Sequence, residues 1–253
     1  ILSSKVRLEK PHIKAYMKQL LEGLHYLHTQ KILHRDIKGA NLLITDSGLL
    51  KIADFGLARS YNDSTVPLTK KVITLWYRPP EVLLESDKYG APADIWSVGC
   101  ILAELLLKYS TNQYRNIWSL PTCDGPHNEA EQIAKIFDVC GTPSKDTWPA
   151  FSSLPGVKNL KFKNKPNILR EHLRKYCKDI QEDELDLCDK LLTCNPDKRL
   201  TAKDALDHEY FWSPPMPASP DQMPRFKEPQ HEWQVKKKRT QEKQRQQQMG
   251  GGG

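Results

Sequence analysis

The stretch that decides the fold is HRDIKGAN at residues 34–41, which is followed by DFG at residues 54–56. Short and mostly apolar runs surround this region, at residues 31–33, 42–44 and 50–52. The sequence DSG at residues 46–48 is a turn signal between the last two runs. We therefore expect small strands around a polar loop at residues 34–41.

Helical patterns occupy most of the chain on either side of these strands. Between residues 9 and 29, apolar residues recur at steps of three and four, which predicts an amphipathic helix. Residues 93–107 are apolar nearly all round, which is typical of a buried helix. Further helical patterns lie at residues 128–139, 183–194 and 201–207. The sequence therefore predicts a mainly helical fold.

Composition limits the class of protein. The six cysteines are scattered and contain no C-x-x-C pair, which favours free thiols in a reducing compartment over zinc or disulfides. No apolar run has the length of a membrane span, and charges interrupt the first residues, so we expect no membrane segment or signal peptide. The net charge of +7 is partly local, with KKKR at residues 236–239. This run favours nuclear import or solvation over direct nucleic-acid binding.

Two segments depart from the helical pattern. From residue 213 prolines cluster, then Lys and Gln dominate, so we expect a folded domain at 1–212 and a disordered tail at 213–253. Residues 108–127 show no periodicity. They are either a functional insert for partner binding or an aberrant insert.

Three further motifs follow the first two in order: PPE at residues 79–81, DIWSVG at residues 94–99 and NPDKR at residues 195–199. The five together resemble the motif series of eukaryotic protein kinases. Four other stretches resemble cyclin-dependent kinases, namely ADFGLAR at 53–59, TLWYRPPE at 74–81, GTP at 141–143 and DHEYF at 207–211. The ending FWSPPMP at 211–217 and the opening ILSS at 1–4 are most similar to the transcription-elongation branch.

The resemblance implies a fold: the C-terminal lobe of a protein kinase, an α-helical bundle with short β-hairpins. The sequence contains no G-x-G-x-x-G or V-A-I-K stretch, which in kinases belong to the small N-terminal lobe. We therefore expect a C-terminal lobe alone, with the small lobe absent and residues 108–127 inserted.

The resemblance also implies catalytic roles. Asp36 orients the substrate hydroxyl and accepts its proton, Lys38 stabilises the transferring phosphate, and Thr74 bridges the two. Asn41 and Asp54 bind Mg²⁺ through oxygen atoms, and with Lys38 they contact ATP.

A regulatory site follows from the same resemblance. Thr69 is the expected activating phosphosite, with Arg35 and Arg59 as the arginines that bind its phosphate. A phosphate adds up to about two negative charges and strong acceptors, which recruit arginines and order a loop.

Substrate and scaffold residues complete the expected site. Val72, Ile73 and Arg78 resemble the pocket that accepts proline after the target Ser or Thr. Glu81 and Arg199 resemble the ion pair that anchors the activation segment. Asp94 is expected to accept hydrogen bonds from the backbone of residues 34–41, and His34 and Phe55 to stack as part of the core.

The function implied is a cyclin-dependent, proline-directed Ser/Thr kinase that uses ATP and Mg²⁺. Its expected partners are a cyclin, an activating kinase, and the C-terminal domain of RNA polymerase II or other Ser/Thr-Pro proteins, and its expected location is the nucleus. The alternative is a truncated kinase-like module that binds partners and transfers nothing.

Overall fold

The computed structural model describes residues 6–61, 73–120, 125–159 and 162–225. Thr69, Val72 and the basic run at 236–239 lie outside these residues. The main helices are α1 (Lys10–Thr29), α2 (Pro80–Leu83), α3 (Ala91–Thr111), α4 (Glu129–Cys140), α5 (Leu169–Tyr176), α6 (Glu182–Leu191) and α7 (Ala202–Leu206). The strands are β1 (Ile32–Leu33), β2 (Leu42–Ile44), β3 (Leu50–Ile52) and β4 (Arg59–Ser60). In the described part of the chain, no helix is long and apolar enough to cross a membrane.

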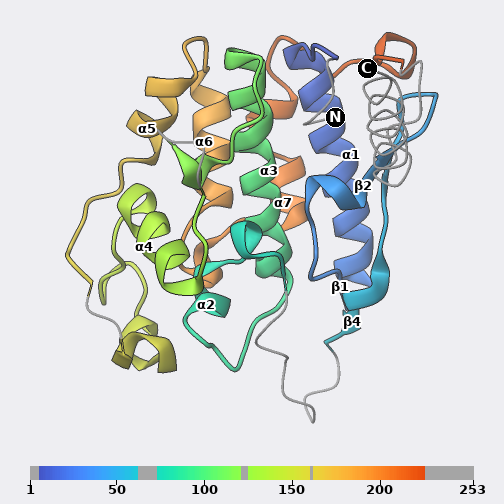
Figure 1. Ribbon diagram of the computed structural model, residues 1–253. Helices are drawn as coiled ribbons and strands as arrows, with labels where there is room; N and C mark the ends of the chain where they lie inside the picture. The colour runs from blue at the N-terminus through green and yellow to red at the C-terminus, as the bar shows by residue number, and fades with distance from the viewer. Residues whose placement is uncertain (1–5, 62–72, 121–124, 160–161, 226–253) are drawn as a thin grey trace, which may run out of the picture.

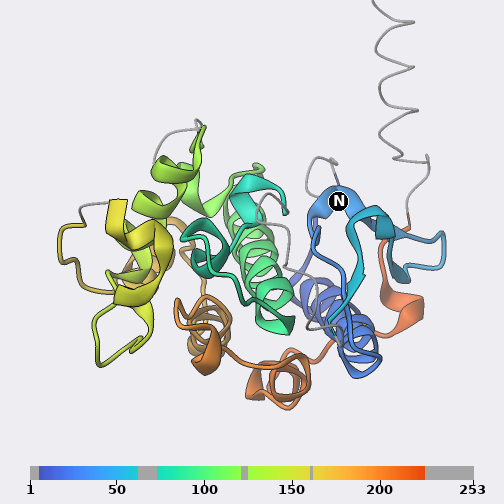
Figure 2. The same ribbon diagram turned by 90° about the horizontal axis from the view of Figure 1, so that it is seen from below.

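The helices pack around α3, which contacts α1, α5 and α6 (Figure 1). Both views place the strands on the α1 side of the molecule and α4 and α5 on the opposite side (Figures 1 and 2). The strands form two antiparallel pairs: β2 with β3, in register Leu43↔Lys51, and β1 with β4, in register Leu33↔Arg59. The polar loop at residues 34–41 therefore lies between β1 and β2, as the sequence predicts.

The central helix α3 is buried along almost its whole length, because its sequence is apolar on all sides. It begins after Gly90 with a proline in its first turn, where a missing N–H costs nothing. It ends at Thr111, and the capping residue Asn112 has a left-handed backbone whose N–H donates to the carbonyl of Lys108. Gly99 lies against Leu192, and a Cβ there would approach the Leu192 side chain to 2.8 Å.

The aperiodic segment at 108–127 begins as part of α3 and then turns into the core. Ile117 and Trp118 are buried, and the Trp118 ring stacks on Trp96 of α3 with a centroid separation of 5.8 Å. Periodicity does not reveal this packing because the partner of Trp118 is on another element. Residues 121–124 lie outside the described residues.

The proline-rich segment that starts at residue 213 is packed in its described part. The Ala218 N–H donates to the Pro11 carbonyl, and the Gln222 carbonyl lies 3.1 Å from His12 Nε2. Met223 is buried against Gly48, whose φ of 79° suits a residue without a side chain. Residues 213–225 therefore hold α1 and the β2–β3 turn together, while the predicted disorder of 226–253 concerns residues outside the described ones.

A buried ion pair joins two segments that are far apart in the chain. The Arg199 guanidinium donates two hydrogen bonds of 2.9 Å to the Glu81 carboxylate, and the two side chains are 0% and 2% exposed. Arg199 also donates to the carbonyls of Pro92 and Thr193. The short helix α2 is thereby tied to the N-terminus of α3 and to the loop after α6.

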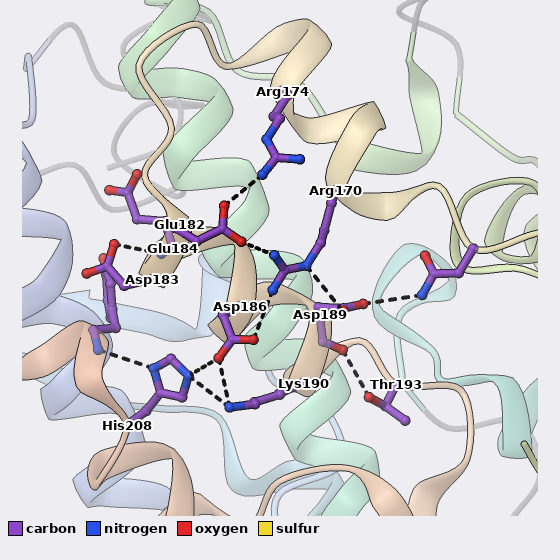
Figure 3. A network of polar contacts seen from close by, with 12 residues as sticks. Arg170, Arg174, Glu182, Asp183, Glu184, Asp186, Asp189, Lys190, Thr193 and His208 are labelled. Atoms are coloured by element: carbon purple, nitrogen blue, oxygen red, sulfur yellow. Dashed lines mark hydrogen bonds and ion pairs between the residues drawn. The ribbon is translucent and has the colours of Figure 1, made fainter.

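A second polar network lies between α5, α6 and His208, nearer the solvent (Figure 3). Arg170 bonds to Glu182 and Asp186, and Asp186 also contacts Lys190 and His208. Burial raises the pKa of Asp186, but hydrogen bonds from Lys190 and His208 outweigh it and hold the pKa below its ordinary value. Because these side chains are partly exposed, the network stabilises the fold less per pair than the buried Glu81–Arg199 bridge.

Another buried polar group is the carboxyl of Glu104 on α3. It accepts hydrogen bonds from the Tyr77 hydroxyl (2.9 and 3.1 Å), Asn116 Nδ2 (2.6 Å) and the Tyr114 hydroxyl (3.3 Å). Burial raises the pKa of Glu104 to about 7, and these donors only partly offset the effect. Burial and the Glu104 charge also raise the pKa of Tyr114, to about 12.

Arg199→Ala should lower the free energy of unfolding by about 3–5 kcal/mol, because it leaves the Glu81 carboxylate buried without its partner. The matched control is Arg174→Ala, which breaks an Arg–Glu pair to Glu182 of 2.7 Å whose side chains are 50% and 67% exposed. The control should lose no more than about 1 kcal/mol. Urea unfolding followed by tryptophan fluorescence measures both, and equal losses would contradict the anchoring role of Arg199.

Glu104→Gln should change the pH dependence of stability. A carboxyl with a raised folded-state pKa stabilises the fold below its ordinary pKa, and this contribution is lost as pH rises through about 7. Between pH 5 and pH 8 the wild type should therefore lose about 2–3 kcal/mol more than the variant, whose amide does not ionise. Urea unfolding at both pH values measures the difference, with the exposed Glu182→Gln as control. Parallel profiles for wild type and Glu104→Gln would show that Glu104 ionises normally.

Candidate active site

The backbone of the polar loop is held from α3. Asp94 accepts hydrogen bonds from the N–H groups of His34 (3.0 Å) and Arg35 (2.9 Å), and its Oδ2 atom lies 2.9 Å from His28 Nε2. Arg35 has a φ of 65°, a conformation that a residue with a side chain keeps only where its surroundings fix it. The buried carboxylate of Asp94 supplies that constraint.

The side chains of the loop converge on Asp36. Lys38 Nζ donates to Asp36 Oδ2 at 2.7 Å, and the Thr74 hydroxyl donates to Asp36 Oδ1 at 2.9 Å. Lys38 Nζ also lies 3.0 Å from the Thr74 hydroxyl. Asn41 Nδ2 donates to Asp36 Oδ2 and to the Asp36 carbonyl. The structure thus brings together four of the residues that the sequence selects.

The charge state of Asp36 follows from these contacts. Burial raises the pKa of its carboxyl, but hydrogen bonds from Lys38, Thr74 and Asn41 and the charge of Lys38 act in the opposite direction and prevail. The pKa of Asp36 is therefore below its ordinary value, and the group is a carboxylate at neutral pH. A carboxylate at this position can accept a hydrogen bond from a hydroxyl group.

The DFG stretch is fixed against the loop by backbone and ring contacts. The Ala53 N–H donates to the Asn41 carbonyl at 2.9 Å, and His34 Nε2 lies 3.0 Å from the Ala53 carbonyl. The rings of His34 and Phe55 meet edge to face, with centroids 5.1 Å apart. His34 is buried, but Phe55 is 48% exposed and is not part of the core as expected. Asp54 has a left-handed backbone and its Oδ1 atom accepts from the Gly56 N–H.

Two oxygen donors at this junction fit a magnesium ion. The amide nitrogen of Asn41 donates to Asp36. The Asn41 Oδ1 atom receives no hydrogen bond from a described residue. The exposed carboxylate of Asp54 keeps its second oxygen similarly available. Mg²⁺ prefers oxygen ligands and commonly adds waters and substrate phosphates to one or two of them from the protein. Within the described residues, no group of three or more His, Cys, Asp or Glu forms a metal cluster.

The two arginines expected to bind a phosphate lie in the polar loop and on β4. Arg35 Nε donates to the Leu57 carbonyl at 2.6 Å and Arg35 Nη1 to the Tyr89 hydroxyl at 3.2 Å. Arg59 lies on β4, opposite Leu33. Because Thr69 lies outside the described residues, its phosphorylation and its pairing with these arginines stay predictions.

The expected proline pocket is represented by two described residues. Ile73 has a φ of 67°, and its carbonyl accepts hydrogen bonds from Arg78 Nε (3.2 Å) and Nη2 (3.0 Å). Arg78 Nη1 in turn bonds to Glu129 at 2.5 Å, a contact that the sequence does not predict because the partners are far apart in the chain. A hollow of about 500 Å³ beside Arg78 is lined by Leu75, Arg78 and residues 127–130.

Comparison with known proteins identifies the fold around this site. The protein kinase domain matches residues 1–211. Among curated proteins, cyclin-dependent kinase C-1 of Oryza sativa subsp. japonica is 52% identical over 235 residues, which cover 92% of this chain and 42% of that protein. Cyclin-dependent kinase C-1 of Arabidopsis thaliana is 49% identical, with 92% and 43% covered. The chain thus spans about two fifths of the length of these relatives.

Two solved structures are similar. The yeast RNA Pol II CTD kinase CTDK-1 complex contains a chain with a TM-score of 0.76 and 39% identity, with 86% of this chain and 67% of that chain covered. The CAK complex of Chaetomium thermophilum bound to ATP-gamma-S gives a TM-score of 0.76 at 36% identity, with 87% and 65% covered.

These matches correct one expectation from the sequence, that the chain is a C-terminal lobe alone and the small N-terminal lobe is absent. The kinase domain match begins at residue 1, and solved kinases cover 86% and 87% of the chain, so the assignment is to the kinase domain as a whole. The lack of a glycine-rich loop does not define the domain. It is a property only of the residues in this sequence.

Proposed function

This chain belongs to the protein kinase family, and from that premise we propose that it acts as a cyclin-dependent, proline-directed Ser/Thr kinase. The reaction is transfer of the γ-phosphoryl group of ATP to Ser-Pro or Thr-Pro sites. The observation that carries the proposal is the cluster of Lys38, Thr74 and Asn41 on the carboxylate of Asp36.

In this reaction Asp36 receives the substrate hydroxyl. Three donors take up part of the acceptor capacity of its carboxylate, which has about four lone-pair positions, so a position for a hydroxyl remains. Its lowered pKa suits a group that orients the hydroxyl and takes the proton late, after the transferring phosphoryl has become electrophilic. Lys38, within 2.7 Å of Asp36, supplies positive charge beside the attacking oxygen.

Asn41 and Asp54 would hold Mg²⁺, which supplies charge neutralisation for the phosphate oxygens. Their own contribution is to present oxygen ligands from two fixed backbone positions. The bond between the Ala53 N–H and the Asn41 carbonyl keeps those positions together.

The preference for proline is supported by the backbone at Ile73. Its carbonyl is occupied by the Arg78 guanidinium and is therefore a poor acceptor for a substrate N–H. An ordinary residue placed there would lose a hydrogen bond with water and gain none, whereas proline has no N–H to satisfy. The preference thus rests on the cost of an unpaired donor.

Partners and substrate are proposed by similarity. The relatives are named as cyclin-dependent kinases, and one similar structure is named as an RNA polymerase II C-terminal domain kinase. We assign this chain a cyclin, an activating kinase acting on Thr69, and the polymerase C-terminal domain or another Ser/Thr-Pro protein as substrate. The nucleus is the corresponding location.

Asp36→Asn should lower kcat for transfer to a Ser-Pro repeat peptide by about 10²–10⁴-fold, because an amide cannot accept the hydroxyl proton. The assay uses the purified full chain with a cyclin, Mg²⁺ and ATP. Asp146→Asn, in an exposed turn, is the matched control and should retain activity.

A Ser-Ala peptide in the same assay tests the pocket and should be a much poorer substrate than Ser-Pro. Equal turnover of the two peptides would contradict the proposed preference for proline. Full activity of Asp36→Asn would contradict the role of Asp36 in the reaction. No transfer by the wild type would contradict the proposed reaction and favour a kinase-like binding module.

A further inference from the structure

Two described segments of the chain, residues 114–120 and 125–126, contact a short turn that lies next to the active site. The turn is Leu75–Tyr77, a single turn of 3₁₀ helix. Trp118 Nε1 donates to the Trp76 carbonyl at 2.8 Å, and Trp76 Nε1 donates to the Pro126 carbonyl at 2.9 Å. The backbone and the side chain of Trp76 are therefore each bonded to one of these pieces, which we call the brace.

The brace is itself fixed to the body of the protein. Trp118 is 1% exposed and stacks on Trp96 with the two rings nearly parallel, at 6°. The backbone N–H of Trp118 donates to Asn116 Oδ1 at 2.9 Å, and the Ser119 hydroxyl donates to the Asn116 carbonyl at 2.7 Å. An indole held in this way is a rigid donor, so its bond to the Trp76 carbonyl positions the turn relative to α3.

A shared carboxyl group makes the second connection between brace and turn. Glu104 of α3 accepts from Tyr77 on the turn and from Asn116 and Tyr114 on the brace. All three donors meet one buried acceptor, so the orientation of the Tyr77 ring depends on where the brace residues lie. Gly125 adds steric contact, since a Cβ there would come within 2.7 Å of the Trp76 ring.

The turn needs such support because of what lies at its two ends. A single 3₁₀ turn has few hydrogen bonds of its own; here they are Tyr77 N–H to Thr74 and Arg78 N–H to Leu75. Thr74, just before the turn, donates to Asp36, and Arg78, just after it, bonds to the Ile73 carbonyl. A rotation of the turn would displace both contacts together.

We propose that Tyr114, Asn116 and Trp118 are positioning residues that set the turn Leu75–Tyr77, and through it Thr74 and the proline pocket at Ile73 and Arg78. The inference rests on the proposed function for its effect on substrate, and on geometry alone for its effect on the turn. It gives residues 114–120 of the aperiodic segment a role in peptide recognition within this chain.

The decisive variant is Trp118→Phe, which keeps an aromatic ring at this position and removes the N–H donor to Trp76 together with part of the indole ring. Its matched control is Trp212→Phe, which removes an indole donor to the Leu206 carbonyl at 3.2 Å from a side chain that is 60% exposed. Tyr114→Phe, which removes one hydroxyl from Glu104, is the milder second variant if Trp118→Phe does not fold.

Two readouts on the full chain test the proposal. Hydrogen exchange at the Tyr77 and Arg78 amides should become about fivefold faster in Trp118→Phe, the factor expected for the loss of one hydrogen bond, and stay unchanged in Trp212→Phe. With a cyclin present, the KM for the Ser-Pro peptide should rise by a similar factor while the KM for ATP stays constant. A merely structural role would lower the melting temperature without this selective change in KM.

Unchanged hydrogen exchange at the Tyr77 and Arg78 amides in Trp118→Phe would contradict the proposal that the brace positions the turn. Faster exchange with an unchanged peptide KM would overturn its role in substrate positioning. If the wild type transfers no phosphate, the proposed function fails by itself, and the exchange comparison still supports or overturns the brace.

Discussion

The carboxylate of Asp94 is the contact on which the geometry of the site depends. It projects from the buried helix α3 and accepts the N–H groups of His34 and Arg35, the two residues that precede Asp36. Two charge-assisted hydrogen bonds in the protein interior are strong and directional, so they fix the left-handed conformation of Arg35. The direction in which Asp36 leaves the backbone follows from that conformation. The buried helix thus serves both as the centre of packing and as the support of the polar loop.

The same helix also supports the segment from Thr74 to Glu81, through the side chains of Glu104 and Trp96. Glu104 accepts a hydrogen bond from the Tyr77 hydroxyl. The Trp96 ring stacks on Trp118, and the Arg199 guanidinium lies 5.0 Å from the centroid of the Trp96 ring. Each of these groups is buried, so losing a partner would leave an unsatisfied polar atom in the interior. This cost favours a single arrangement of the segment from Thr74 to Glu81. Phosphoryl transfer needs such fixed positions, because most of its catalysis comes from placement and charge.

The sequence predicts well those features that are local in the chain. The helix expected at residues 9–29 is α1, the runs at 42–44 and 50–52 are β2 and β3, and the buried helix expected at 93–107 is α3, extended to Thr111. Strand β4 has only two residues, which is too short for an alternating pattern to be recognised. Helix α5 is too rich in charged residues to show a clear apolar periodicity. The packing of Trp118 on Trp96, of Met223 on Gly48 and of Arg78 on Glu129 joins residues whose separation in sequence leaves no periodic signal. The motif residues Asp36, Lys38, Asn41 and Thr74 could be selected, but not their mutual hydrogen bonds.

Asp94 determines the charge state of Asp36 indirectly, through the backbone of His34 and Arg35. The most direct measurement is the pKa of the Asp36 carboxyl in Asp94→Asn, followed by carbon-13 NMR during a pH titration of the folded variant. An amide in place of the carboxylate removes one acceptor for the loop, so Lys38 and Thr74 should no longer both reach Asp36, and its pKa should rise toward the ordinary value for aspartate. A folded Asp94→Asn protein in which Asp36 keeps the lowered pKa of the wild type would contradict the account.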